Sequence, residues 1–414
     1  MLFLKTDPSR LTKAHLTDTY LNDAYRIDCE VITPFTVKKF TIKKQIAQFM
    51  LLSLSGLALT LSHAANSASA KNQSLHFYHQ DWEVACDNTR TCRAAGYQPD
   101  DGNGFPVSVL LTRKAGAQQP VSSQVKLGST DYVEGQPTPQ SVDLLVNAKN
   151  YGKVVLESGS LSGDLTQAQT RALLTALAGK SVIQFRSGKV VWRLSDVGAA
   201  AVLLKMDDAQ GRVGTSGALI KKGQKPETGV LPALPLPVIN WVKPVAPSAG
   251  LKQLVKAVDL NQLKKQLLLQ QPKSDDPVTD DECPVMSGED EYAKFELQLE
   301  PLTPQKLLVS GLCWRGAYNE GYGYWLINAQ PPYQPQRVTT GASDYVDGII
   351  SADQKGRGLG DCWSHQTWTW NGQQFIHSAE LTTGQCRMIE PGGAWELPTR
   401  VTLVKKAVLA TTKK

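Results

Sequence analysis

From residue 81 onward, alternating apolar and polar positions predict a chain built mainly of β-strands. Trp82, Val84 and Cys86 alternate with charged or small residues, which is the pattern of a half-buried strand. A polar turn then leads to Cys92 on a returning strand, so the stretch from Asp81 to Tyr97 predicts a hairpin. Further strands bounded by Gly, Pro or Asn are predicted at 106–112, 141–146, 153–157, 181–185 and 189–194.

The apolar period changes to that of a helix in two places. Thr166 opens a T-Q-A-Q capping-box pattern and the run ends at Gly179, which predicts a short helix. Asp196 is expected to cap a second helix over 197–209. Residues 75–222 are therefore expected to form a first α+β domain with two short helices.

A different pattern separates this region from the rest of the chain. Residues 225–247 contain six prolines, which exclude helix and central strand and predict an extended linker. Apolar residues then recur at helical spacing with lysines between them, at Leu251, Leu254, Val255, Val258 and Leu263. This amphipathic basic helix could bind a membrane surface or a partner, but burial of its apolar face against a domain is the commoner arrangement. With an acidic connector at 274–282, residues 223–280 are expected to join two domains.

The segment from 281 to 410 is predicted to form a second, mainly antiparallel β domain rich in tryptophan. Asn371-Gly372, between TWTW and QQFIH, indicates a hairpin, because a type I′ turn needs positive φ at both central residues. Other strands are predicted at 295–299, 306–313, 323–328, 367–370, 374–377 and 399–405. The expected fold class is α+β, mainly β, with two disulfide-stapled β-rich domains joined by a Pro-rich linker and an amphipathic helix.

The apolar run from Phe49 to Leu61 is too short to span a bilayer and has the length of a signal-peptide core. Lysines precede it, and small residues at Ser62 and Ala64 suit a cleavage site; a buried helix is the alternative. A signal peptide at 38–64, cleaved near Ala64 or Ala65, predicts a periplasmic or secreted protein with no membrane segment after cleavage.

A signal peptide is expected at the start of a chain, so residues 1–37 are not expected to precede it. They are predicted to be a mis-assigned N-terminal extension, with translation beginning near Val37. They should then carry no function in the mature protein.

The net charge and the number of cysteines limit the classes of function that the sequence supports. Loss of residues 1–64 removes eight basic and five acidic residues and lowers the net charge from +6 to +3. This is too weak to indicate nucleic-acid binding. Six cysteines remain, and an even count in an exported chain predicts three disulfides. Proximity along the chain favours Cys86–Cys92, Cys283–Cys313 and Cys362–Cys386, whereas no CxxC pair or zinc-site spacing is present.

Two pairs of similar segments suggest that the halves of the chain descend from one β module. GSTDYVEG at 128–135 resembles GASDYVDG at 341–348, and CRAAGY from Cys92 resembles CWRGAY from Cys313. Chance resemblance between turn-like segments is the alternative. Duplication predicts that the two DYV segments end strands at matching loops.

Sequence motifs of known catalytic sites are missing: G-x-S-x-G, HExxH, a Walker loop and a dinucleotide fingerprint. His76, His79 and Asp81 could bind a metal, but three residues near a domain start are a weak signal. No metal site and no cofactor is predicted.

The segment KGRGLGDCW, from Lys355 to Trp363, carries the remaining candidate chemistry. Its glycines and cations could cradle an anion, although residue type favours glycines needed for a tight approach to the 362–386 disulfide. Nearby Trp and Tyr would suit sugar or peptide binding. A hydrolase site near Asp361, Ser364 and His365 is also conceivable, but no known triad spacing is present. The predicted ligand-binding residues are Lys355, Arg357, Asp361, Trp363 and His365.

Four motifs together resemble an exported bacterial family, domain of unknown function 1176, whose members are marked by six cysteines. They are WEVACDNTRTCRAAGY, CWRGAYNEG, KGRGLGDCW and W-x-W-N-G-x-x-F. The resemblance covers nearly the whole mature chain. It implies an exported location and paired cysteines, but it supplies no catalytic residue. The W-x-x-x-C opening also makes the first domain similar to the invasion-associated locus B family.

Export, paired cysteines and missing catalytic motifs favour a non-enzymatic binding or envelope-associated protein, with an envelope protein or glycan as partner. One alternative is a hydrolase or cell-wall-modifying enzyme with its site near Asp361, Ser364 and His365. Another is a secreted inhibitor of a glycosidase or protease, with GASDYVDG on a projecting loop.

Overall fold

The computed structural model describes residues 74–133, 135–271, 282–288 and 294–407. The predicted N-terminal extension, the signal peptide with its cleavage site and most of the acidic connector lie outside these ranges. Among the described helices, none combines the length and apolar character needed to cross a bilayer.

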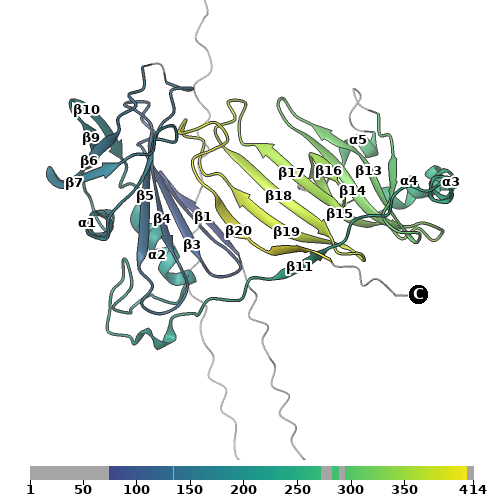
Figure 1. Ribbon diagram of the computed structural model, residues 1–414, viewed down its shortest axis with the longest axis horizontal. Coiled ribbons are helices and arrows are strands. Elements are labelled where there is room, and N and C mark those ends of the chain that lie inside the picture. Colours follow the sequence, from purple (N-terminus) through teal and green to yellow (C-terminus); the bar gives the residue numbers. More distant parts are fainter. Residues whose placement is uncertain (1–73, 134, 272–281, 289–293, 408–414) are drawn as a thin grey trace, which may run out of the picture. The chain divides into compact units, whose positions relative to one another are not determined.

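A six-stranded antiparallel sheet opens the described chain (Figure 1). Its strand order is β1-β2-β3-β4-β5-β8, and each strand pairs antiparallel with the next in that order. The bounds are β1 Leu75–His79, β2 Trp82–Cys86, β3 Cys92–Tyr97, β4 Val107–Arg113, β5 Val121–Leu127 and β8 Ser162–Asp164. The predicted hairpin from Asp81 to Tyr97 is therefore present as β2 and β3.

A second, four-stranded sheet of order β10-β9-β6-β7 and two helices accompany the first sheet. The strands are β6 Ser141–Val146, β7 Lys149–Val155, β9 Ile183–Ser187 and β10 Val190–Leu194, and the helices are α1 Gln167–Leu177 and α2 Ala199–Ala209. Thr166 caps α1 with both hydrogen bonds of the predicted capping box.

The start of α2 differs from its prediction. Its N-cap is Gly198 rather than Asp196, and Asp196 instead accepts a hydrogen bond from the Ser181 N–H at 2.7 Å. Gly198 has a φ of 94°, and a Cβ there would lie 2.0 Å from the His79 carbonyl oxygen. The close backbone approach therefore requires glycine at the cap.

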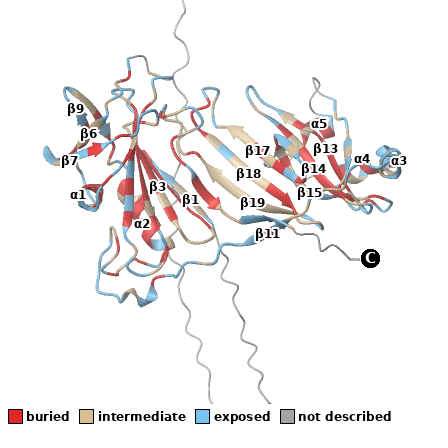
Figure 2. Cartoon of the chain, in the orientation of Figure 1, coloured by how far each residue is buried: buried red, intermediate tan, exposed pale blue. Residues whose placement is uncertain are grey.

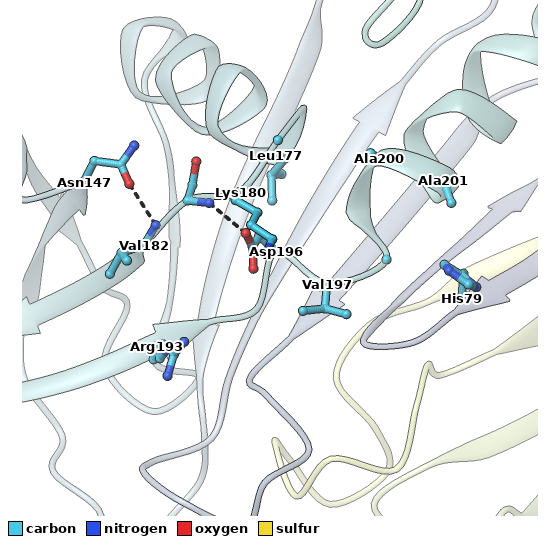
Figure 3. Close-up of a pocket in the computed structure, with 13 residues that line it drawn as sticks. His79, Asn147, Leu177, Lys180, Val182, Arg193, Asp196, Val197, Ala200 and Ala201 are labelled. Atoms are coloured by element: carbon cyan, nitrogen blue, oxygen red, sulfur yellow. Dashed lines mark hydrogen bonds between the residues drawn. The ribbon is translucent and has the colours of Figure 1, made fainter.

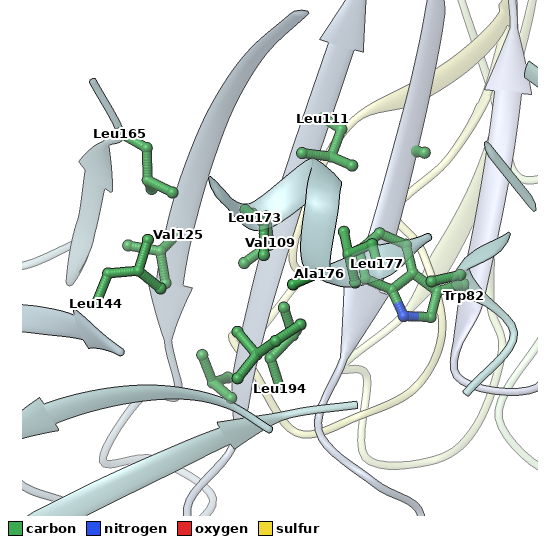
Figure 4. Close-up of a cluster of buried hydrophobic side chains, with 14 of the residues drawn as sticks. Trp82, Val109, Leu111, Val125, Leu144, Leu165, Leu173, Ala176, Leu177 and Leu194 are labelled. Atoms are coloured by element: carbon green, nitrogen blue, oxygen red, sulfur yellow. The ribbon is translucent and has the colours of Figure 1, made fainter. Parts of the chain in front are cut away.

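The main hydrophobic cluster of this region lies between α1 and the inner faces of the two sheets (Figure 4). Val109 and Val125 come from the first sheet, Leu144 and Leu194 from the second, and Leu173 from α1. The period-2 pattern places Trp82, Val84 and Cys86 in this cluster as well.

The central strands β2 to β4 of the first sheet are largely buried on both faces, as the colouring around β3 shows (Figure 2). Strand β2 is therefore not half-buried as predicted but buried at every position. On the second face, Ala85, Tyr97 and Leu110 pack with Trp395 and Leu397 from the C-terminal part of the chain. The side chains of β2 do alternate between the two faces of the sheet, but other parts of the protein cover both faces.

The Pro-rich segment is extended and includes one strand. β11, Val238–Trp241, pairs in parallel with β21, Leu403–Lys406, and a 3-10 turn, η1, covers Glu227–Gly229. The predicted amphipathic helix is two helices, α3 Ala249–Lys256 and α4 Leu260–Leu268. Asp259 divides them because its carboxylate accepts the first N–H groups of α4.

The C-terminal part contains two antiparallel sheets, of order β12-β13-β14-β15 and β16-β17-β18-β19-β20. The bounds are α5 Pro284–Ser287, β12 Gln298–Pro301, β13 Lys306–Arg315, β14 Glu320–Asn328, β15 Gln336–Ala342, β16 Asp344–Val346, β17 Ile349–Lys355, β18 Trp363–Trp370, β19 Phe375–Thr382 and β20 Leu397–Arg400. Leu263 and Leu267 of α4 are buried against β13 and β14, so the apolar face of this helix packs on a sheet.

The hairpin predicted at Asn371-Gly372 joins β18 to β19, but its loop has four residues because Trp370 pairs with Phe375. Gly372 has a φ of 95°, whereas Asn371 does not have a positive φ. The Asn371 carboxamide oxygen instead accepts the N–H groups of Gln373 and Gln374 at 2.9 Å, which closes a wider turn than type I′.

Three disulfides join Cys86 to Cys92, Cys283 to Cys313 and Cys362 to Cys386, the pairing that proximity favours. The repeat-like segments do not occupy matching places. Cys92 begins β3 whereas Cys313 lies near the end of β13, and Tyr132 lies in a turn whereas Tyr345 lies in β16. The expectation of matching loops is therefore wrong.

Candidate functional site

A cavity of about 510 Å³ lies between β1 and the ends of β17, β18 and β19. β1 contributes His76 and Tyr78, which are two residues apart and therefore share a face of the strand. Both cysteines of the Cys362–Cys386 disulfide also line it. We call this space the first cavity.

A row of polar side chains from three adjacent strands forms the opposite side of the first cavity. Gln354 pairs with Ser364 in register, and Ser364 pairs with Thr382, so the three side chains lie on one face of the sheet. The Gln354 amide nitrogen donates to the carbonyl oxygens of Glu320 and Gly341, which fixes its orientation.

Two atoms of this row are enclosed without a hydrogen-bond partner: Gln354 Oε1 and Thr382 Oγ1. A buried polar group left unpaired costs about 1–3 kcal/mol. Solvent does not reach either atom, so a ligand would recover that cost only after a small movement of the two side chains that exposes these atoms to the cavity.

A buried carboxylate anchors the β1 side of the first cavity. Glu83 is only 2% exposed, and its Oε1 accepts the Tyr97 hydroxyl at 2.8 Å and the Gln385 N–H at 2.7 Å. Its Oε2 lies 2.9 Å from His76 Nε2. The hydrogen bond with Glu83 raises the pKa of His76, so this pair can compensate its own charge.

Three of the sequence-predicted binding residues gather on the other face of β17 and β18. Lys355 Nζ lies 5.4 Å from the centre of the Trp363 ring, and the Trp363 and His365 rings stack with centroids 6.0 Å apart. Lys355 and Trp363 also border the first cavity, at the ends of their strands. His365 does not line it.

The other two predicted residues, Arg357 and Asp361, bind each other. Arg357 donates to both carboxylate oxygens of Asp361, at 2.7 and 2.5 Å. Burial would raise the pKa of Asp361, but the hydrogen bonds from Arg357 and the Met388 N–H outweigh it and lower the pKa. Gly356 passes so close to the disulfide that a Cβ would lie 2.6 Å from Cys362 Sγ. The glycine therefore serves this close approach rather than an anion cradle.

The residues of the predicted hydrolase site do not converge. Ser364 and His365 are neighbours on β18 and point to opposite faces of the sheet. The partner of His365 is Asp353, with 2.6 Å between Nδ1 and Oδ1, and Asp361 is occupied by Arg357. In the part of the chain that the structure describes, Ser364 has no hydrogen bond to a histidine.

His76, His79 and Asp81 do not form a metal site. The two histidines are three residues apart on a strand, which places them on opposite faces. Asp81 accepts hydrogen bonds from Ser195 at 2.6 Å and from Arg387 at 2.9 Å. Asp361 has two sulfur atoms near it, but both belong to the disulfide and cannot act as thiolate ligands.

GASDYVDG is a packed hairpin rather than a free projecting loop. The Tyr345 ring lies 6.1 Å from that of Tyr324 and 6.4 Å from that of Phe375. Asp347 binds Lys243 at 3.0 Å. Tyr345 therefore anchors the segment to the sheet, whereas Val346 at its tip is 60% exposed.

A larger cavity, of about 770 Å³, lies beside the N-terminus of α2 (Figure 3). Its central polar groups already have partners. Asn147 accepts the Val182 N–H at 2.9 Å, and Asp196 accepts the Ser181 N–H at 2.7 Å. These hydrogen bonds stabilise the fold, and neither Asn147 Oδ1 nor the Asp196 carboxylate is left without a partner for a ligand to satisfy.

Sequence reasoning did not identify Glu83, Gln354 or Thr382 as site residues. The sequence does contain a signal for Glu83, because this acidic residue lies within the otherwise apolar strand WEVAC. Gln354 and Thr382 had none, since their alignment depends on the register of β17, β18 and β19.

Comparisons with known proteins add a family but no activity. The family model described as "Protein of unknown function (DUF1176)" matches residues 76–402. "Uncharacterized protein YpfG" of Escherichia coli (strain K12) is 28% identical over 324 residues, which cover 71% of this chain and 84% of that protein. No solved structure matches.

Proposed function

The chain belongs to the DUF1176 family of proteins of unknown function, and we propose that it is a non-enzymatic binding protein for a small carbohydrate. The first cavity is the proposed binding site. The observation that carries the proposal is the polar row opposite β1, in which Gln354 Oε1 and Thr382 Oγ1 have no partner.

A hydroxyl-rich ligand suits the groups that line the first cavity. Sugar hydroxyls both donate and accept, so they can pair with the Gln354 oxygen and with the Thr382 and Ser364 hydroxyls. Tyr78 is 70% exposed and offers an aromatic surface to the apolar side of a sugar ring. Because His76 and Glu83 compensate each other and Lys355 borders the cavity only from the other face of the sheet, over the Trp363 ring, a neutral sugar is favoured over a charged one.

We also propose that the protein works in an oxidising compartment, periplasmic or extracellular. The three disulfides support this, because such bonds persist mainly outside the cytosol. The signal peptide at 38–64 and the similarity of the first domain to the invasion-associated locus B family are part of the same proposal. A glycan partner would then be available in the envelope.

The proposal is tested by calorimetric titration of the mature chain with neutral hexoses, N-acetylhexosamines and their short oligomers. At least one sugar should bind, and Tyr78→Ala should weaken its binding by about two- to tenfold, because an aromatic contact contributes roughly 0.5–1.5 kcal/mol. Thr382→Val should weaken the binding of the same sugar, because it removes a hydroxyl without changing side-chain volume much.

Tyr151→Ala is the matched control. Tyr151 is a half-exposed tyrosine with Lys149 Nζ 5.0 Å from its ring, but it does not line the first cavity. Equal loss of affinity in Tyr78→Ala and Tyr151→Ala would contradict binding at this site. Labelling of the wild type, but not of Ser364→Ala, by a serine-hydrolase probe would overturn the non-enzymatic function.

A further inference from the structure

A second cavity, of about 520 Å³, lies between β11 and the β18–β19 hairpin with the adjoining end of β20. It shares no lining residue with the first cavity. Its polar lining residues include Asn240 of β11, Asn371 of the hairpin loop, His377 of β19 and Arg400 of β20. Both of its titratable lining residues are bases.

Arg400 is half-buried. Its Nε is enclosed without a hydrogen-bond partner, and no carboxylate oxygen among the described residues forms an ion pair with its guanidinium within 4.0 Å. Glu380 is its register partner on β19, yet the two side chains do not form an ion pair. A desolvated cation without a partner is costly, so this guanidinium is expected to have a counter-ion.

The other interior arginines differ from Arg400 in this respect. Every other buried or half-buried arginine that the structure describes has an interaction with an acceptor or a charged partner. Examples are Arg93 with Asp87 at 3.0 Å, and Arg387 with Asp81 at 2.9 Å. An unpaired guanidinium is therefore not a general feature of this protein.

His377, in the same cavity, has one ring nitrogen without a partner, whereas its ring also has a hydrogen bond with the Ala379 backbone. Its Nε2 is enclosed without a hydrogen bond, and its ring stacks on Trp368 with centroids 5.0 Å apart. Burial lowers the pKa of His377; Glu380 opposes this effect and Arg400 adds to it. Arg400 is thus close enough for its charge to act on the imidazole.

We propose that the second cavity binds the oxyanion group of a small ligand, a carboxylate, phosphate or sulfate, at Arg400 and His377. A guanidinium fork matches the oxygen pairs of all three groups, and protonated His377 adds a donor. The Asn371 side-chain oxygen is used by the turn, so its amide nitrogen remains to donate. This site is separate from the sugar site and does not depend on it.

The test titrates the mature chain, in a buffer without oxyanions, with inorganic phosphate, sulfate and acetate in turn. Binding is followed by the NMR signals of the His377 ring and by thermal unfolding. At least one anion should raise the pKa of His377 and raise Tm. Comparison of the three identifies whether a tetrahedral or a planar oxyanion is preferred.

Arg400→Gln should weaken that binding about tenfold or more, because a charge-assisted hydrogen bond contributes roughly 1.5–3 kcal/mol. Without anion, the variant should be as stable as the wild type or more stable, because the arginine has no partner to lose. Lys405→Gln is the control, since this exposed lysine of β21 does not line the second cavity.

Three results would overturn the proposal. One is that no anion changes the pKa of His377 at concentrations of tens of millimolar. Another is that Lys405→Gln weakens binding as much as Arg400→Gln, which would indicate attraction by net charge. The third is that Arg400→Gln is destabilised equally with and without anion, which would mean that Arg400 already pairs with Glu380 in solution.

Discussion

Single residues decide where this protein leaves hydrogen-bonding capacity unused. Glu83 is buried, and its carboxylate has a partner at both oxygens. Gln354 and Thr382, on the other side of the first cavity, each retain an atom without one. A site with a satisfied charge and unsatisfied neutral groups is suited to a neutral, hydroxyl-rich ligand.

His76 should make the stability of the protein depend on pH. Its folded pKa is raised above 6.5, so its contribution is fully present below about pH 6.5 and is lost as pH rises through the folded pKa. His76→Gln should remove this part of the dependence. The measurement is the free energy of unfolding by urea from about pH 5.5 to about pH 8.5.

The wild-type curve must be compared with a variant, because His377 contributes with the opposite sign: its pKa is lowered, so its contribution grows as pH rises. His79→Gln is the control, since His79 lies on the same strand and forms no described ion pair. If His76→Gln and the wild type have the same pH dependence, the His76–Glu83 bond does not form in solution.

At the scale of elements, local signals predicted much of the secondary structure. Thr166 caps its helix through a residue three positions on, and the hairpin from Asp81 to Tyr97 pairs adjacent strands, so both patterns can be read directly from the sequence. The start of α2 could not be predicted, because the constraint on Gly198 comes from the His79 carbonyl, far away in sequence.

The capping box of α1 is expected to stabilise the helix and can be tested by mutation. Thr166→Ala should destabilise the protein by about 1 kcal/mol, because the Gln169 N–H loses its acceptor. Urea unfolding provides the measurement. Thr175→Ala, on the exposed side of the same helix, should change stability by only about a few tenths of a kcal/mol. A loss that is equal in the two variants would contradict the capping role.

At the scale of the whole molecule, one hydrophobic cluster joins segments that are about three hundred positions apart. Ala85, Tyr97 and Leu110 from the first sheet pack with Ile389 and Trp395. Sequence patterns cannot show such a contact, because residues 383–396 have no regular period. For the same reason the first cavity, which needs β1 beside β17–β19, could not be predicted from KGRGLGDCW.

The two domains predicted at 75–222 and 281–410 are therefore expected to unfold in one transition. Trp395 is 9% exposed and donates to Ser108 Oγ at 2.7 Å. Trp395→Ala should cost about 3–5 kcal/mol and should lower the unfolding midpoint of both parts together. Calorimetry and tryptophan fluorescence provide the two probes.

Leu359→Ala serves as the control, because Leu359 is 56% exposed and its loss should change stability by less than about 0.5 kcal/mol. Two separate transitions, only one of which moves in Trp395→Ala, would show that the domains are independent and that the shared cluster contributes little.

Sugar binding in the first cavity is tested most directly by a crystal structure of residues 65–414 with the tightest-binding sugar from the titrations. The sugar should lie in the first cavity, with its ring against Tyr78 and its hydroxyls hydrogen-bonded to Gln354 Oε1 and Thr382 Oγ1. A sugar bound elsewhere, with this cavity empty, would show that the first cavity is not the binding site.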